Sequence, residues 1–145
     1  MSQEPKPKIF PRVDHITLNV KDFEQSKKLY TELFVDYLSG TVEIDDPELF
    51  GIGFGNGLRI FFLFELKAEN KEFKDDIFDK SRVGLHHFAL ELENKSAVDN
   101  IYKKLLELDI KILDKPQFYP DYVDNYYALY FQDPNGFKME FVAYK

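Results

Sequence analysis

Cysteine and tryptophan are absent from this 145-residue chain, and histidine occurs only three times. The lack of cysteine excludes disulfide bonds, thiolate nucleophiles and cysteine-based metal sites, and it fits a reducing compartment. No apolar run approaches the about 20 residues that a membrane-spanning helix needs. Residues 1–11 are polar and proline-bearing, without the apolar core of a signal peptide. We therefore expect a cytoplasmic protein with a flexible lead-in at residues 1–11.

An excess of positive charge is also missing, since the formal net charge is −7. Contact with nucleic-acid phosphates requires clustered Lys and Arg side chains, and so does binding to an anionic membrane surface. Neither kind of partner is expected. Fifteen Phe and nine Tyr residues favour a core and a cavity lined by rings, as in a protein that binds a small molecule.

What the chain does contain is an internal repeat. Residues 13–20 align with residues 85–92 at a constant shift of 72, and this shift places His15 over His87. Each half ends with an Asn-Gly pair followed by a strand-like run, at Asn56-Gly57 and at Asn135-Gly136. A repeat of this kind dictates the architecture. It predicts two fused halves, 12–66 and 83–145, joined by a linker at 67–82 in one domain.

Each half predicts one strand, one helix and three further strands. In the first half, residues 13–20 alternate like a strand, and an apolar stripe from Phe23 to Tyr37 indicates a helix capped by Asp22. Gly40 either ends this helix or starts the next turn. Strands near 41–45, 50–55 and 58–65 follow, the last two joined by a hairpin at Asn56-Gly57. The second half predicts a strand over 85–92, a helix over 95–108 and strands near 110–114, 126–132 and 137–144.

Residues 116–125 form an insertion without a counterpart in the first half. This aromatic loop either covers a pocket or is a surface loop with its own small ring cluster. The glycines at 51, 53, 55 and 57 lack the G-x-G-x-x-G spacing and precede a strand, which excludes a dinucleotide-binding loop.

Two repeat-related histidines and one carboxylate form the candidate functional site. His15 and His87 occupy equivalent strand positions, and Glu140 lies on the last strand, on the face opposite Met139 and Phe141. If the halves are related by a twofold axis, both imidazoles and the carboxylate converge on one cavity. Such a set is typical of a divalent metal site with open positions. A lone histidine on a strand is more often structural than a metal ligand. His86 would point to the face opposite that of His87, and it is interpreted as structural.

Three segments carry a family resemblance: residues 14–20, residues 86–90, and residues 130–140, which read Tyr-Phe-Gln-Asp-Pro-Asn-Gly-Phe-Lys-Met-Glu. They resemble the vicinal oxygen chelate superfamily of glyoxalase I, extradiol dioxygenases, fosfomycin-resistance and bleomycin-resistance proteins. The resemblance implies an α+β fold of tandem βαβββ modules forming a paired incomplete barrel, and a homodimer. It also implies a site in which His15, His87 and Glu140 bind Zn, Fe, Mn, Ni or Co.

The same resemblance assigns substrate contacts, and here the chain departs from some family members. Tyr130 would hydrogen-bond the substrate as a catalytic residue, while Thr17, Phe61 and Tyr126 would line its pocket. Phe61 stands where glyoxalase I carries a further glutamate that serves as ligand and base, and Glu65 is a distant substitute. Residues 68–82 contain no histidine such as extradiol dioxygenases use, and few cations follow Glu140 to hold a phosphonate.

Three functions remain open at this stage. The first is a metal-dependent enzyme acting on a small substrate that chelates through adjacent oxygens. The second is a metal-free protein of the bleomycin-resistance type, for which abundant rings and negative charge would suit a cationic aromatic guest. The third is a structural or regulatory domain with a relict site.

Overall fold

The computed structural model describes residues 13–45, 48–64 and 83–145. The lead-in, the linker and Glu65 lie outside the described residues. The elements, in chain order, are β1 (His15–Asn19), α1 (Phe23–Leu33), β2 (Leu38–Asp45), β3 (Glu48–Phe54), β4 (Arg59–Phe64), β5 (Phe88–Glu91), α2 (Lys95–Glu107), β6 (Lys111–Phe118), β7 (Tyr127–Gln132) and β8 (Lys138–Ala143).

The strands form two four-stranded sheets with the same topology. The first sheet has the order β1-β4-β3-β2, and the second has the order β5-β8-β7-β6. In each sheet the first strand pairs in parallel with the last, and the other pairings are antiparallel. The fold is therefore α+β with tandem βαβββ modules, as the sequence predicted.

Strand alternation decides which face of the first sheet carries its histidine. Along β1, His15 and Thr17 are exposed, whereas Leu18 is buried and Ile16 is half-buried. Successive side chains of a strand point to opposite faces. The same pattern recurs in the second half, where Glu140 lies between the buried core residues Met139 and Phe141. The histidine-bearing face of each sheet is thus the face turned away from the core.

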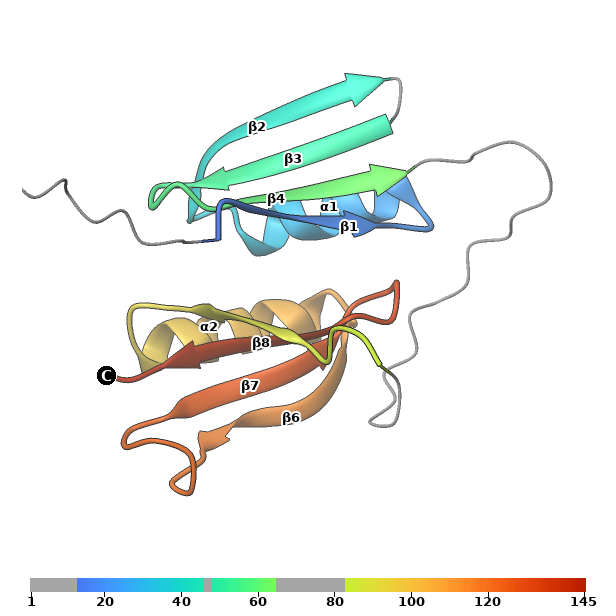
Figure 1. Cartoon of the computed structure of the whole chain (residues 1–145). Coiled ribbons are helices and arrows are strands. Elements are labelled where there is room, and N and C mark those ends of the chain that lie inside the picture. The colour runs from blue at the N-terminus through green and yellow to red at the C-terminus, as the bar shows by residue number, and fades with distance from the viewer. Residues whose placement is uncertain (1–12, 46–47, 65–82) are drawn as a thin grey trace, which may run out of the picture.

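The core lies between the two modules. In Figure 1, α1 lies on the side of the first sheet turned toward the second sheet, and α2 lies on the side of the second sheet turned toward the first. One cluster of buried residues contains side chains from both halves. Phe34, the residue that caps the end of α1, packs for example against Phe141 of β8, with ring centroids 5.8 Å apart. The two histidine-bearing faces therefore lie on the outer sides of this shared core.

The turn between β7 and β8 ties the two halves together. The Tyr30 hydroxyl donates to Asp133 Oδ2 at 2.6 Å, and both residues are buried. Asn135 accepts from the Lys21 backbone N–H at 2.9 Å, and its side-chain amide lies 3.2 Å from Ser26 Oγ. The Asp-Pro-Asn-Gly motif thus supplies contacts between the modules as well as a tight turn.

Several predicted boundaries differ from the structure. Strand β5 covers Phe88–Glu91 instead of the predicted 85–92, so His87 precedes the strand and does not lie in it. Helix α1 ends at Leu33, before the apolar stripe does, and Gly40 lies within β2 instead of ending the helix or starting a turn. Strand β6 continues through Pro116 to Phe118, in a stretch that was expected to be a loop. Proline is tolerated there because β6 is the edge strand of its sheet and its register shifts between Asp114 and Gln117.

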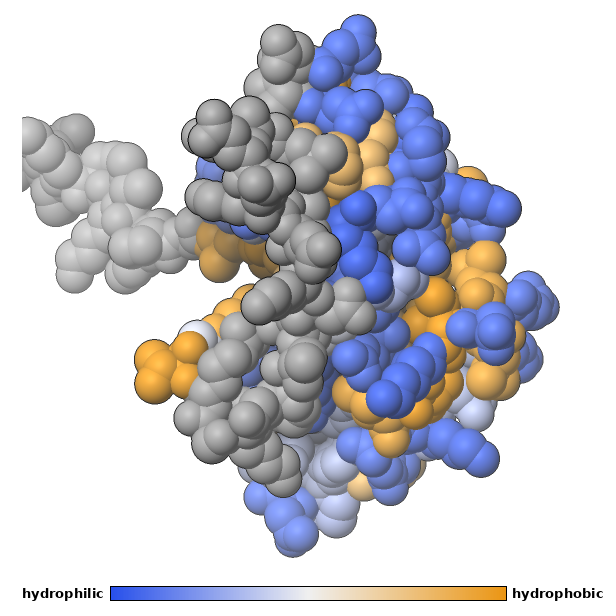
Figure 2. Space-filling model, turned by 90° about the vertical axis from the view of Figure 1, so that its right-hand side faces the viewer, coloured by the Kyte–Doolittle hydropathy of each residue, from blue (hydrophilic) through white to orange (hydrophobic). Residues whose placement is uncertain are grey.

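On the face shown in Figure 2, apolar patches interrupt a largely hydrophilic surface. Among the described residues, no helix combines the length and the apolar character that crossing a bilayer requires.

Candidate metal centre

The second sheet places His87 beside Glu140. His87 lies immediately before β5, and β5 pairs in parallel with β8, where Ala89 is opposite Glu140. His87 Nε2 lies 3.0 Å from Glu140 Oε2, and the glutamate side chain is only 2% exposed. A carboxylate this deeply buried requires partners. Because a carboxylate only accepts, His87 Nε2 is the donor to Glu140 Oε2, while His87 Nδ1 lies 2.6 Å from His86 Nδ1. A metal ion bound at Nε2 would take the place of that proton.

Two tyrosines complete the surroundings of Glu140. The Tyr126 hydroxyl donates to Glu140 Oε1 in a short hydrogen bond. Tyr130 lies directly opposite Glu140 in the β7–β8 register, and its ring meets the His87 ring edge to face at 5.7 Å. Burial, reinforced by the Glu140 carboxylate, raises the pKa of both tyrosines well above the ordinary value. Both phenols therefore keep their protons near neutral pH and act as hydrogen-bond donors.

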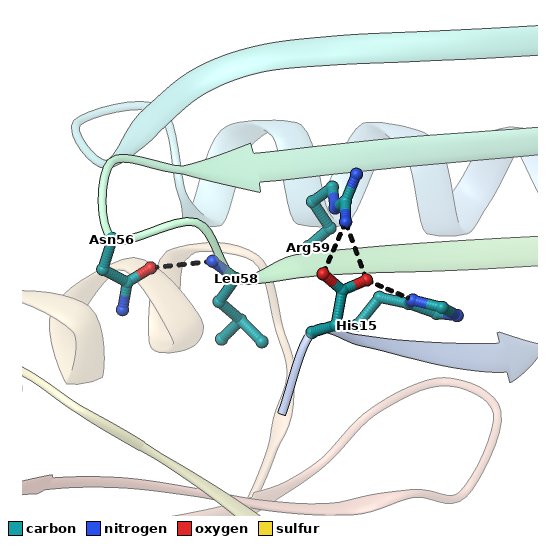
Figure 3. Close-up of polar contacts among 5 residues, drawn as sticks. His15, Asn56, Leu58 and Arg59 are labelled. Carbon is teal, nitrogen blue, oxygen red and sulfur yellow. Dashed lines mark hydrogen bonds and ion pairs between the residues drawn. The ribbon is translucent and has the colours of Figure 1, made fainter. Parts of the chain in front are cut away.

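The first sheet holds His15 through a chain of polar contacts at the start of β1. His15 donates from Nδ1 to Asp14 Oδ2 at 2.8 Å, and Arg59 Nη2 contacts both oxygens of Asp14 at 2.7 Å (Figure 3). A histidine whose Nδ1 carries the proton presents Nε2 as an acceptor. Asp14 and Arg59 thus select the tautomer of His15 that can bind a metal ion through Nε2.

The two pocket residues predicted on the first sheet lie next to His15. Phe61 of β4 meets the His15 ring edge to face at 5.4 Å, and Thr17 is opposite Phe61 in the β1–β4 register. Tyr126, the third predicted pocket residue, lies in the second half, just before β7 and beside Glu140. Each histidine therefore has its own aromatic neighbours.

The structure brings together two of the three predicted ligands, His87 and Glu140. Within the described part of a single chain, no three His, Cys, Asp or Glu side chains are grouped so that they could hold a metal ion. His15 lies on the outer face of the other module, where its side chain is 51% exposed. The candidate ligands thus fall into two separate groups, His87 with Glu140 on one face and His15 on another.

The donors that are present fit a divalent cation. A buried carboxylate oxygen and an imidazole nitrogen lie 3.0 Å apart, and the second imidazole is exposed with its Nε2 available. Nitrogen donors combined with one carboxylate suit Zn, Fe, Mn, Ni and Co. The pairs that orient the imidazoles, Asp14 with His15 and His86 with His87, are of the kind that commonly support metal ligands.

Sequence reasoning missed Asp14, Arg59 and the role of His86. Arg59 could be found only from the β1–β4 register, in which it lies directly opposite His15 in a parallel pair. His86 was interpreted as structural from its parity, yet its ring reaches back to His87 because it lies ahead of β5, where strand geometry does not apply. Asp14 likewise precedes β1, and its contact depends on that irregular backbone.

Comparison with known proteins points to one family. The sequence model of the Glyoxalase/Bleomycin resistance protein/Dioxygenase superfamily matches residues 12–141. The uncharacterized protein YqjT of Bacillus subtilis is 27% identical over 129 residues, which cover 89% of this chain and 96% of that protein.

Solved structures show the same fold. A glyoxylase/bleomycin resistance protein/dioxygenase domain from Frankia sp. EAN1pec superposes with a TM-score of 0.72 at 22% identity, covering 94% of each chain. A variant of the fosfomycin resistance protein FosX from Listeria monocytogenes, complexed with Mn(II) and 1S,2S-dihydroxypropylphosphonic acid, superposes with a TM-score of 0.65 at 15% identity, covering 92% of this chain and 90% of that one. The matched family model spans nearly the whole chain, and this protein therefore belongs to the Glyoxalase/Bleomycin resistance protein/Dioxygenase superfamily.

Proposed function

We propose that this protein is a divalent-metal-dependent enzyme acting on a small molecule that binds through adjacent oxygens, and that two copies of the chain build each active site. The buried His87–Glu140 pair carries the proposal, because it places an imidazole beside a carboxylate, and a metal ion held by these two would need a further ligand. His15 supplies a third donor only from a different surface. The cytoplasmic location expected from the sequence belongs to the same proposal.

Repeat-related apolar side chains support assembly of two copies. Val13 and Leu85 occupy equivalent positions two residues before His15 and His87, and they are 65% and 61% exposed. Exposed apolar side chains beside a polar site commonly mark a protein–protein interface. In a twofold dimer, each outer face of one protomer can meet the complementary face of its partner, so that two equivalent sites form.

In such a site, each residue has a definite task. Asp14 and Arg59 hold the His15 ring, and Glu140 keeps one oxygen toward His87 while Tyr126 binds the other. The Tyr130 phenol, which lies beside His87 and Glu140, would donate a hydrogen bond to an oxygen of the substrate. When bound, a divalent ion would polarise a coordinated oxygen or lower the pKa of a bound water. Phe61 supplies no base, so any base must come from the substrate, a bound water or another residue.

Elemental analysis of protein purified without chelators tests this proposal. We expect about one divalent ion per chain. His15→Ala, His87→Ala and Glu140→Gln should each lower metal affinity by more than the about 10- to 100-fold typical of changes outside the ligand set. Glu91→Gln removes an exposed carboxylate from the neighbouring strand β5 and should leave the metal content unchanged. Wild-type protein that takes up no divalent ion would contradict the proposal.

Thermal-shift screening of the metal-loaded protein then addresses the reaction. Dicarbonyls and catechols carry two adjacent oxygens, and epoxides and glutathione adducts extend the screen to other small oxygen-bearing compounds. We expect at least one class to raise the melting temperature of wild-type protein but not of Glu140→Gln.

A second candidate, a metal-free binding protein, is favoured by one observation. Five tyrosines form a continuous set of ring contacts beside Glu140, namely Tyr119, Tyr122, Tyr126, Tyr130 and Tyr144. Tyrosine faces attract cations. This candidate predicts that a cationic aromatic compound binds equally well to wild-type protein and to His15→Ala, without any metal.

A further inference from the structure

A hollow lies on the outer face of the first sheet, beside His15. Its volume is about 320 Å³, and its walls are mainly apolar. Two cross-strand rows explain it. One row runs from His15 through Arg59 to Gly53 and Gly40, and the next runs from Thr17 through Phe61 to Gly51 and Val42. Three of the positions on β2 and β3 are glycine, so the sheet there has almost no side chains.

The three glycines differ in how much open space lies above them. A Cβ on Gly51 would lie 2.7 Å from the Phe61 ring, so the ring already covers that position. A Cβ on Gly53 would meet only ordinary contacts from 3.5 Å outward, and one on Gly40 would have no neighbour within 4 Å. The floor at Gly40 and Gly53 is therefore open, with the edge of Phe61 and the stem of Arg59 as its walls.

The charges that line the hollow do not favour a charged ligand. The only charged side chain among the lining residues is Arg59, and its guanidinium contacts both oxygens of Asp14. The lining also includes the apolar side chains of Phe61 and Val42. Burial of apolar surface is thus the main gain available to a ligand here, and a flat ring matches a bare stretch of sheet next to an aromatic wall.

The hollow also lies within reach of the candidate ligand. Gly53 is two strands away from His15, and neighbouring strands are about 4.8 Å apart, so the floor begins roughly 10 Å from β1. Phe61 touches both His15 and the hollow. We infer that this glycine-floored hollow binds an uncharged aromatic or similarly bulky apolar group of the molecule whose oxygens bind beside His15. The inference rests on the proposed function for the identity of those oxygens.

Two hydroxamic acids test the inference, because they share one chelating group and differ only in the attached group. By isothermal titration of the metal-loaded protein, we expect benzohydroxamic acid to bind about tenfold more tightly than acetohydroxamic acid. Gly40→Leu should fill the hollow and abolish this preference while keeping the affinity for acetohydroxamic acid. Gly55→Leu is the matched control, since Gly55 also has open space but does not line the hollow, and it should keep the preference.

The outcomes separate the two ideas. If wild-type protein binds both hydroxamic acids equally, the subsite is refuted and the metal site stands. If neither compound binds, the proposed function fails, and a metal-independent measurement then shows whether the hollow binds an aromatic group. Benzyl alcohol, which lacks a chelating group, should then shift the amide NMR signals of Gly40 and Gly53 but not that of Gly55. Unchanged signals at Gly40 and Gly53 would overturn the inference.

Discussion

Tyr30 shows how one residue joins the two halves of this protein. Its phenol is fully buried and donates to Asp133, and it also approaches Met139 Sδ at 3.1 Å. The desolvated Asp133 carboxyl has a raised pKa even though Tyr30, Asn135 and two backbone groups donate to it. A carboxyl that is costly to bury depends on all of its donors.

Replacing Tyr30 by Phe should therefore destabilise the fold. The ring packing on Phe62 would remain, but Asp133 would lose one buried partner, which costs about 1–3 kcal/mol. Urea unfolding followed by far-UV circular dichroism measures this change. Tyr102→Phe is the control, because the described residues show no hydrogen bond to that half-buried hydroxyl, and it should change the free energy of unfolding by less than about 0.5 kcal/mol. Equal effects of the two substitutions would contradict this view of Tyr30.

A second prediction at this scale concerns alkaline pH. Burial, followed by the hydrogen bond to Asp99, raises the pKa of Tyr127 to about 12. In the unfolded chain a tyrosine loses its proton near pH 10. Between about pH 10 and 12 the folded state therefore binds more protons, and the free energy of unfolding falls as the pH rises. Urea titrations from pH 9 to 12 should show this fall, and Tyr127→Phe should make it shallower. Identical curves for the wild-type and Tyr127→Phe proteins would contradict a raised pKa of Tyr127 in the folded state.

The elements show which local signals in the sequence were sufficient. Asp22 was expected to cap α1, and its side chain accepts from the Gln25 backbone N–H at 2.9 Å. The repeat places Asn94 at the same position, where it accepts from the Ala97 N–H at 2.9 Å. Local hydrogen bonds of this kind depend on a few neighbouring residues, so the sequence alone predicts them.

Both caps should contribute measurably to stability. Asp22→Ala and Asn94→Ala are each expected to lower the free energy of unfolding by about 1 kcal/mol, since each leaves an N–H group of the first helical turn without its partner. Asp36→Ala, which removes an exposed carboxylate outside the helices, is the control, and its effect should stay within about 0.5 kcal/mol. Chemical unfolding curves compare the three variants. A cap variant as stable as wild type would show that solvent replaces the cap fully.

Other element-scale features depended on distant partners and could not be predicted. Strand β6 passes through Pro116 only because β7 pairs with it, joining Gln117 to Ala128 and Phe118 to Tyr127. The glycines at 51 and 53 were predicted to lie in a strand near 50–55 and were excluded as a dinucleotide loop. Their place in the hollow appears only once the β2–β3–β4 register aligns them with Phe61 and Arg59.

At the scale of the whole molecule, the sequence predicted the repeated fold but not how its halves face each other. The resemblance supplied the paired modules and the candidate ligands His15, His87 and Glu140. The placement of the histidine faces on the outer sides of a shared core follows from long-range packing, such as that of Phe34 on Phe141, which no local pattern encodes. That arrangement is why we propose that the ligands meet between two chains.

A mixed dimer tests this central proposal most directly. Chains carrying His15→Ala and Glu140→Ala, with different affinity tags, can be co-expressed and the heterodimer isolated. One of its two sites would receive an intact His15 from one protomer and intact His87 and Glu140 from the other. The account predicts about one divalent ion per heterodimer, two per wild-type dimer and almost none in either variant homodimer. A heterodimer as empty as both variants would contradict it.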